Sequence, residues 1–377
     1  MSKAHAKLSA SGSSQWLNCT GSIRASADVI DEGSSFAQEG TCAHEVGDLC
    51  LKNKQPASDY IGKVVEGVEV TEEMAEYVQG YVDYVLSFGG EQFYEEKVDF
   101  SNWVPEGFGT SDAIVMDEVS NTLHVIDLKY GKGVVVDAEN NTQGMLYALG
   151  AYSDFSLVYA FDSVVIHIYQ PRVSNFSTWE VSVKDLLEWA DNVVRPKADE
   201  AMTDDAPRTP GAKQCQWCKV KATCPALYDH TNEVIVADFD TIEDTLPSPS
   251  TLNDAQLRVV LDNKKLIESW LQAVEDHTRR TVESGESFSG YKLVAGRSLR
   301  KFRDLDEAEA VLSELLGDDA YEHKLLTVAK AEKALGAKRK KEIGDLIIKP
   351  EGKPVLVPDS DKRASLTDCS DDFETCS

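Results

Sequence analysis

The chain has 377 residues, 42% of them hydrophobic and 27% charged, which is the composition of an ordinary globular protein. Its formal net charge of −27 excludes a surface that attracts nucleic acid as a whole, because that attraction comes from lysine and arginine side chains that displace counterions. Binding is local, however, so a nucleic-acid site would have to be a local cluster of basic residues. No apolar run approaches the length of a membrane span and the first residues lack a signal-peptide pattern, so we expect a cytoplasmic protein without membrane partners.

Helices are predicted along most of the first quarter of the chain. Residues 1–30 have a Ser-rich start followed by a helix, and residues 36–51 have helical character. Residues 70–88 carry apolar side chains at spacings of three and four, the pattern of an amphipathic helix. Residues 93–100 alternate moderately between apolar and polar side chains and are predicted to form a strand.

The centre of the chain is predicted to be a β-hairpin followed by a helix. Two short β-type runs at residues 113–116 and 122–128 are separated by a polar turn, and residues 142–153 have a helical pattern. A strand, a second strand and a helix interrupted near Pro196 are predicted at residues 161–169, 179–183 and 183–202. This order indicates an α/β domain with a mixed sheet that helices cover on both faces.

The composition changes after residue 235. Residues 1–235 are predicted to form the α/β domain, and residues 236–250 are an acidic and then Pro/Ser-rich linker. Residues 251–358 are predicted to form a mainly helical C-terminal domain with a β-ribbon at residues 288–302. Residues 359–377 are acidic and sparse in large apolar side chains, so we expect a disordered tail.

Two carboxylates and a lysine are predicted to meet on the hairpin. Asp112 stands where the first strand begins, and Asp127 and Lys129 are two apart on the second strand, so their side chains point to the same face. If the strands pair, Asp112 comes close to Asp127, and the three groups could hold a divalent metal ion beside a phosphate. Taken alone, Asp-x-Lys is a weak signal, because charged pairs at strand ends are common and usually only solvated.

Polar residues before and after the hairpin extend this set. His44, in the helical stretch at residues 36–51, is able to act as a ligand, although the default for a histidine near a helix start is an ordinary surface residue. Gln143 and Tyr147 are four apart and therefore lie on one face of the helix predicted at residues 142–153.

Three cysteines follow the α/β pattern with the spacing C-x2-C-x5-C, at Cys215, Cys218 and Cys224. This spacing suits a metal better than disulfides in a reducing compartment. The set is one thiolate short of a tetrahedral site, and Cys19 is the best candidate for the fourth, because the next two cysteines are better explained within the helix at residues 36–51. Four sulfurs could hold zinc or a 4Fe–4S cluster; the alternative is a set of unrelated cysteines.

The order of these groups resembles the RecB-type PD-(D/E)xK nuclease superfamily. That family has an H motif, a GxxD motif, a DxK motif and a QxxxY motif, and the matching stretches here are EGTCAHE (39–45), GTSD (109–112), DLK (127–129) and QGMLY (143–147). A cysteine before the H motif and three after the last strand are similar to the iron–sulfur subgroup, which includes CRISPR-adaptation nucleases and AddB-type nucleases. The stretches HAKLSASGSSQWLNCTGS, GYKLVAGRSLRKF and PEGKPVLVPDSDKR also look like an uncharacterised family of phage and prophage proteins in this group.

The resemblance implies a restriction-endonuclease-like mixed β-sheet core with an iron–sulfur clamp formed by the four cysteines, and zinc is the alternative metal. The groups that would bind Mg²⁺ or Mn²⁺ are His44, Asp112, Asp127 and the backbone carbonyl of Leu128. Lys129 would orient or deprotonate a metal-bound water, and Gln143 and Tyr147 would position the DNA strand or the lysine. The proline of the family name is absent, since Ser111 precedes the first aspartate, a variation that many RecB-type members share.

Local basic residues partly answer the charge objection. Lys132 lies next to the DxK motif. The predicted ribbon carries a basic cluster with Phe302 interleaved, which favours contact with DNA strands or ends, and the cluster consists of Arg297, Arg300, Lys301 and Arg303.

On this resemblance we expect a Mg²⁺- or Mn²⁺-dependent deoxyribonuclease, namely a phage exonuclease that hydrolyses phosphodiester bonds at DNA ends in recombination or replication. Its expected partners are DNA ends or single strands and a phage single-strand-binding or annealing protein, in the cytoplasm of the host cell. The alternative is a non-catalytic DNA- or protein-binding subunit that retains the nuclease fold. A second alternative, an acidic DNA mimic, is disfavoured by the intact carboxylate–lysine set.

Overall fold

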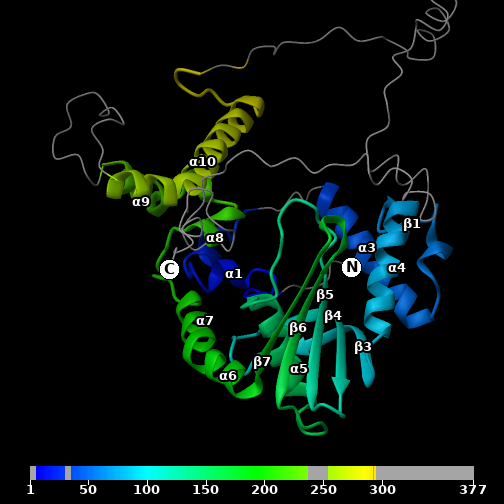
Figure 1. Cartoon of the computed structure of the whole chain (residues 1–377). Coiled ribbons are helices and arrows are strands. Elements are labelled where there is room, and N and C mark those ends of the chain that lie inside the picture. The colour runs from blue at the N-terminus through cyan, green and yellow to red at the C-terminus, as the bar shows by residue number, and fades with distance from the viewer. Residues whose placement is uncertain (1–5, 30–34, 237–253, 292, 294–377) are drawn as a thin grey trace, which may run out of the picture. The chain divides into compact units, whose positions relative to one another are not determined.

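The structure is a computed structural model that describes residues 6–29, 35–236, 254–291 and 293 (Figure 1). Contacts between Cα atoms divide the chain into two compact units, Met1–Ser287 and Phe288–Ser377. Almost all described residues belong to the first unit. Most of the predicted linker, the basic cluster of the predicted ribbon, the helices after it and the acidic tail lie outside the described residues.

A five-stranded mixed sheet forms the centre of the first unit (Figure 1). Its strands are β3 (Glu91–Asp99), β4 (Phe108–Asp117), β5 (Thr122–Leu128), β6 (Ser163–Gln170) and β7 (Asn175–Ser182), in that spatial order. All neighbouring pairs are antiparallel except β5 and β6, which are parallel and therefore need a crossover connection. The predicted α/β class, with its mixed sheet and β4–β5 hairpin, is confirmed.

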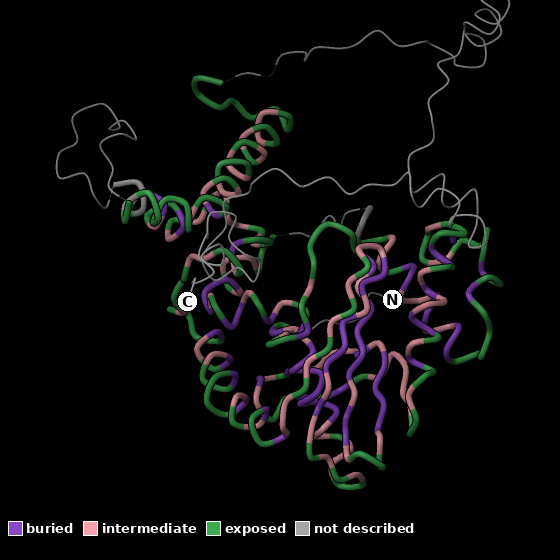
Figure 2. Tube along the Cα trace, in the orientation of Figure 1, coloured by how far each residue is buried: buried purple, intermediate pink, exposed green. Residues whose placement is uncertain are grey.

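Helices cover both faces of this sheet. Helices α3 (Ser35–Asn53) and α4 (Glu72–Leu86) pack on one face, and α5 (Thr142–Phe155), the crossover between β5 and β6, packs on the other. Strand β4 shows the cause: Ala113 belongs to the core beside α3 and α4, whereas Ile114 belongs to the core beside α5. Figure 2 shows the resulting buried stretches along the strands. Both layers follow from the alternation of side chains along buried strands.

Helix α5 begins after Asn141, whose side-chain oxygen accepts a hydrogen bond of 3.0 Å from the backbone N–H of Gly144. This N-cap determines where the first turn starts. Gln143 and Tyr147 therefore lie one turn apart at the beginning of the helix, next to the end of β5.

The other described elements before the cysteines are short. They are α1 (Ser13–Trp16), α2 (Ser22–Ala25), η1 (Ala57–Tyr60), β1 (Val64–Val65) paired with β2 (Val68–Glu69), η2 (Pro171–Val173), α6 (Val183–Trp189), the π-helical turn η3 (Ala190–Val194) and α7 (Arg195–Ala201). The helix predicted at residues 183–202 is thus three consecutive segments. Its interruption comes just before Pro196, as the sequence predicts, because proline lacks the N–H that continues a helix.

The cysteine region contains α8 (Ala212–Gln216), η4 (Lys221–Thr223) and α9 (Pro225–Val236), followed by α10 (Asp254–Glu283). Leu266 and Trp270 of α10 pack against Cys215 and Leu227, so α10 belongs to the first compact unit. Of the predicted ribbon, the described part contains no strand. No helix in the described ranges combines the length and the apolar composition needed to cross a membrane.

Candidate functional site

The β4–β5 hairpin brings two carboxylates together. Ala113 pairs with Ile126, so Asp112 and Asp127 are the next residues on the two strands. The backbone N–H of Leu128 donates a hydrogen bond of 2.7 Å to Oδ2 of Asp112. Only 3% of the surface of Asp127 is exposed. The structure therefore places these two carboxylates side by side, as the hairpin pattern predicts.

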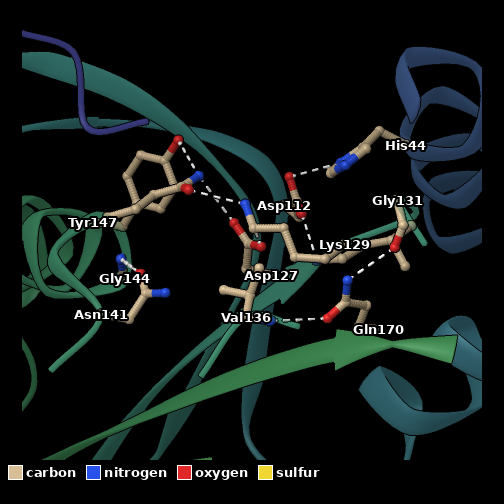
Figure 3. Close-up of polar contacts among 12 residues, drawn as sticks. His44, Asp112, Asp127, Lys129, Gly131, Val136, Asn141, Gly144, Tyr147 and Gln170 are labelled. Carbon is tan, nitrogen blue, oxygen red and sulfur yellow. Dashed lines mark hydrogen bonds and ion pairs between the residues drawn. The ribbon is translucent and has the colours of Figure 1, made fainter. Parts of the chain in front are cut away.

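Lys129 lies in a polar network that reaches from β5 to α5 (Figure 3). Its Nζ atom is 2.8 Å from Oδ2 of Asp127 and donates a hydrogen bond of 2.9 Å to Oε1 of Gln143. The Gln143 amide donates to Oδ1 of Asp127 at 3.0 Å and to the hydroxyl oxygen of Tyr147 at 3.3 Å. Gln143 therefore holds the carboxylate and the ammonium group at the same time.

The packing of Tyr147 explains why a glycine, Gly109, stands three residues before Asp112. A Cβ atom on Gly109 would lie 2.6 Å from a ring carbon of Tyr147, closer than real contacts allow. The ring of Tyr147 thus packs directly against the backbone of β4. The glycine of the GxxD stretch and the tyrosine of the QxxxY stretch are required by the same contact.

His44 reaches Asp112 from the helix layer on the face of the sheet opposite α5. Its Nδ1 atom is 3.0 Å from Oδ1 of Asp112, and both side chains are mostly shielded from solvent. The two oxygens of Asp112 therefore face His44 on one side and the backbone of β5 on the other. The structure brings His44 to the predicted site, although it lies far from the hairpin in the sequence.

Glu95 joins the site although the sequence patterns did not single it out. One ligand atom each from His44, Glu95 and Asp112 lies within 4.8 Å of the others, and in the described ranges these three form the single such group of histidine, cysteine or acidic residues. On β3, Glu95 sits between two residues that pair with the neighbours of Asp112. Its φ of +47° lies in the left-handed region, which is strained for a non-glycine residue and is found preferentially at functional sites.

The pKa directions at the site follow from burial and from the cationic or protonatable group beside each aspartate. Burial raises the pKa of Asp127, because the charged form loses its hydration. Burial opposes ionisation of Asp112 too, but His44 and Lys129 hold the pKa of Asp112 below its ordinary value. Burial lowers the pKa of Lys129, yet Asp127 keeps that pKa above its ordinary value. Burial and Asp112 act in opposite directions on His44, whose pKa is raised on balance.

The donor set fits Mg²⁺ or Mn²⁺. The carboxylates of Glu95 and Asp112 gather with the imidazole of His44, and Asp127 lies next to Asp112 on the paired strand. Carboxylate oxygens are the ligands that hard divalent cations prefer. Lys129 compensates one negative charge of this group. A divalent cation that displaces the proton of His44 would compensate the remaining negative charges of the carboxylates.

The cysteines form a second group, away from the sheet. Cys19, Cys215, Cys218 and Cys224 line one small cavity of about 20 Å³. Burial raises the pKa of Cys19, and the nearby Cys224 thiol raises it further. The backbone N–H of Thr209 donates a hydrogen bond of 3.3 Å to the sulfur of Cys19. The structure thus brings the four predicted residues to one place.

The two remaining described cysteines lie elsewhere, in α3. Cys42 is buried, with its sulfur 3.5 Å from that of Met74 in α4. Burial raises the pKa of Cys50 to about 11, so its thiol is protonated at neutral pH. Both behave as small buried side chains of the helix core.

The predicted DNA-binding residues are only partly described. Lys132 is exposed in the loop between β5 and α5, three residues after the end of the Asp-x-Lys stretch. The other predicted contacts, Arg297, Arg300, Lys301 and Arg303, lie outside the described residues.

The chain belongs to the family described as "Protein of unknown function (DUF2800)", whose model matches residues 5–364. Among solved structures, one described as "Crystal structure of SSO0001" is similar to this chain at 13% sequence identity. The match covers 60% of this chain and 89% of that chain, with a TM-score of 0.28.

Proposed function

We propose that the chain is a metal-dependent nuclease of the RecB-type PD-(D/E)xK kind, which hydrolyses phosphodiester bonds in DNA. One observation carries the proposal: Asp112, Asp127, Lys129 and His44 converge from a hairpin and a separate helix into one largely buried group. Carboxylates with an imidazole suit a divalent cation, and a neighbouring ammonium group suits a phosphate. This combination offers a metal site and a cation for the phosphate, both of which assist the hydrolysis of a phosphodiester.

The residues that would hold the metal are His44, Glu95, Asp112, Asp127 and the backbone carbonyl of Leu128. When bound, Mg²⁺ or Mn²⁺ would polarise the scissile phosphate and lower the pKa of a bound water. Including Glu95 extends the set implied by the sequence motifs.

Lys129 has the electrostatic role in the proposed reaction. Its ammonium group is held by Asp127 and Gln143 and would stabilise negative charge that develops on the phosphate. Gln143 and Tyr147 are positioning residues, since they fix Lys129 and Asp127 through one chain of hydrogen bonds. A preorganised lysine of this kind needs no rearrangement during the reaction.

The four cysteines are proposed to hold an iron–sulfur cluster that clamps a restriction-endonuclease-like domain. All four cysteines line one cavity, so four thiolates can reach one metal centre. The cysteine order that resembles the iron–sulfur subgroup favours a 4Fe–4S cluster, and a tetrahedral zinc ion is the alternative.

The biological setting rests on the resemblance of the motifs alone. We propose a phage or prophage exonuclease that acts on DNA ends or single strands in the host cytoplasm during recombination or replication. A single-strand-binding or annealing protein is its proposed protein partner.

Purified full-length protein, incubated with linear and circular DNA and Mg²⁺ or Mn²⁺, tests the proposal. We expect wild type to degrade linear DNA and Asp127→Ala to lose about 100-fold or more of the rate. Lys129→Gln, a milder change at the same site, is expected to lose activity without loss of fold, as checked by thermal unfolding. Glu118→Ala is the matched control, because Glu118 is an exposed acid in the turn at the other end of the hairpin. No cleavage by wild type, or equal cleavage by Asp127→Ala, would overturn the nuclease and favour a binding subunit.

A further inference from the structure

The loop at residues 131–135 leaves β5 directly after the proposed catalytic lysine and has the sequence GKGVV. A buried glutamine, Gln170 at the end of β6, holds this loop by its carbonyl groups (Figure 3). Nε2 of Gln170 donates hydrogen bonds of 2.8 Å to the carbonyl oxygens of both Gly131 and Val134. Its Oε1 atom accepts a hydrogen bond of 3.1 Å from the backbone N–H of Val136.

Asn175, at the start of β7, completes this arrangement. Its Nδ2 atom donates to the carbonyl oxygen of Val136 at 2.7 Å and to Oε1 of Gln170 at 3.1 Å. The Gln170 side chain thereby makes four hydrogen bonds, which is its full capacity. Since β6 is paired with β5, these contacts hold the loop at a constant position relative to Lys129.

The N–H groups of the loop point to a ligand. Within the described part of the chain, the backbone N–H groups of residues 131–135 make no hydrogen bond, whereas three carbonyls of the same segment and its flank are bonded to side chains. The exposed Lys132 forms no ion pair with any other described residue. Backbone N–H donors without a protein partner, beside an ammonium group, are available to an anion.

Neither packing within the protein nor backbone conformation requires the two glycines of the loop. A Cβ atom added to Gly131 or Gly133 would meet no atom within 4 Å, so packing does not require glycine there. Neither residue has the positive φ that would favour glycine. Glycine also lets a ligand approach the backbone closely, and the open space beside both residues is compatible with that reason.

We propose that residues 131–135 bind a phosphate group of the DNA strand next to the scissile one, through their backbone N–H groups and Lys132. Gln170 is a positioning residue for this site, because it turns the carbonyls of the loop inward. The inference rests on the proposed function for the identity of the ligand as DNA. It adds to that function the place where an otherwise acidic protein holds its polyanionic substrate.

Fluorescence anisotropy with a labelled linear DNA, in EDTA and at several salt concentrations, tests the proposal without any cleavage. Gly133→Ala is expected to weaken DNA binding about tenfold by blocking one charge-assisted hydrogen bond, with an unchanged melting temperature. Lys132→Gln is expected to weaken binding and to reduce the slope of log Kd against log salt by about 1. Gly133→Ala removes no charge, so its slope should equal that of wild type.

Two matched controls exclude general effects. Gly89→Ala alters another exposed glycine that has open space and no positive φ, and Lys184→Gln removes an exposed charge of α6. Both should bind DNA as wild type does. Loop variants that also bind as wild type would overturn the loop site, even if wild type cleaves DNA and Asp127→Ala does not. Conversely, loop-dependent binding by a protein that never cleaves DNA would support the loop site and overturn the nuclease.

Discussion

At the scale of single residues, the site is built from charges that constrain one another. Asp127 is nearly inaccessible and shares Gln143 with Lys129, whereas Asp112 faces His44 and Glu95. Motif order was sufficient to single out most of these residues. The sequence motifs did not identify Glu95, because nothing local distinguishes it from Glu96. Its position beside Asp112 depends on which strand pairs with β4.

We predict that Glu95→Gln weakens Mn²⁺ binding by about 10- to 100-fold, the usual effect of losing a group that supports a metal site. Isothermal titration calorimetry with Mn²⁺ measures this directly. Cleavage of DNA by the variant should recover at higher Mn²⁺ concentration, whereas loss of the fold would not be rescued. Glu96→Gln, the next residue on β3, is the control. An affinity equal to that of wild type would remove Glu95 from the site.

At the scale of elements, the contact between α4 and the sheet contains a partly buried chain of polar side chains. Nδ1 of His167 on β6 is 2.8 Å from the hydroxyl of Tyr84 on α4, and Nε2 is 3.0 Å from Nδ1 of His124 on β5. Phe88 packs against both imidazole rings. Burial and, as the smaller cause, the neighbouring His124 together lower the pKa of His167 to about 3, so His167 is neutral in the folded protein at neutral pH.

This chain should make stability depend on pH. The pKa of His167 is about 3 when folded and about 6.5 when unfolded, so between these values the unfolded state binds more protons. The contribution of neutral His167 to the free energy of unfolding is therefore fully present above about pH 6.5. Between about pH 6.5 and pH 3 this contribution falls by about 1.4 kcal/mol for each pH unit.

Urea unfolding at pH 7 and pH 5 measures this difference. His167→Gln lacks the titrating group and should be less sensitive to pH over this interval. His277→Gln, at an exposed position of α10, is the control and should behave as wild type. Equal pH sensitivity of wild type and His167→Gln would contradict the assignment.

At the scale of the whole described unit, the N-terminal segment is joined to the segment before the cysteines. The hydroxyl of Thr20 donates a hydrogen bond of 3.0 Å to Glu200, and the N–H of Gly21 donates one of 2.9 Å to the carbonyl of Pro207. A Cβ atom on Gly21 would lie 2.5 Å from the carbonyl oxygen of Ala206, so only glycine fits this close approach. These contacts position the neighbouring Cys19 beside the other three cysteines.

We predict that Cys19→Ser, which removes one of four sulfurs, abolishes iron binding and lowers the melting temperature. The first effect follows from the incomplete ligand set, and the second from the lost link between distant segments. Anaerobic purification, elemental analysis and a visible absorption spectrum measure both metal content and colour. Cys50→Ala, a buried position in α3, is the control that should keep the metal. Colourless wild-type protein with one zinc would overturn the cluster assignment.

The sequence by itself determined the local elements and the order of the reactive groups. The apolar spacing at residues 70–88 predicts α4, and alternation about a polar turn predicts the β4–β5 hairpin, because helical and strand periods are read within a few residues. The spacing of Asp127 and Lys129 places both side chains on one face of β5. The short β1–β2 pair and α9 were not predicted, since they lack a distinct period.

Only the tertiary structure decided which distant residues meet. Pairing of β3 with β4 adds Glu95, and packing of α3 against the sheet brings His44 to Asp112. The carbonyls of the loop after β5 are held by Gln170, which follows that loop by more than 30 residues and carries no motif. Such contacts depend on the pairing of strands and the packing of helices over long sequence separations, which no local periodicity specifies.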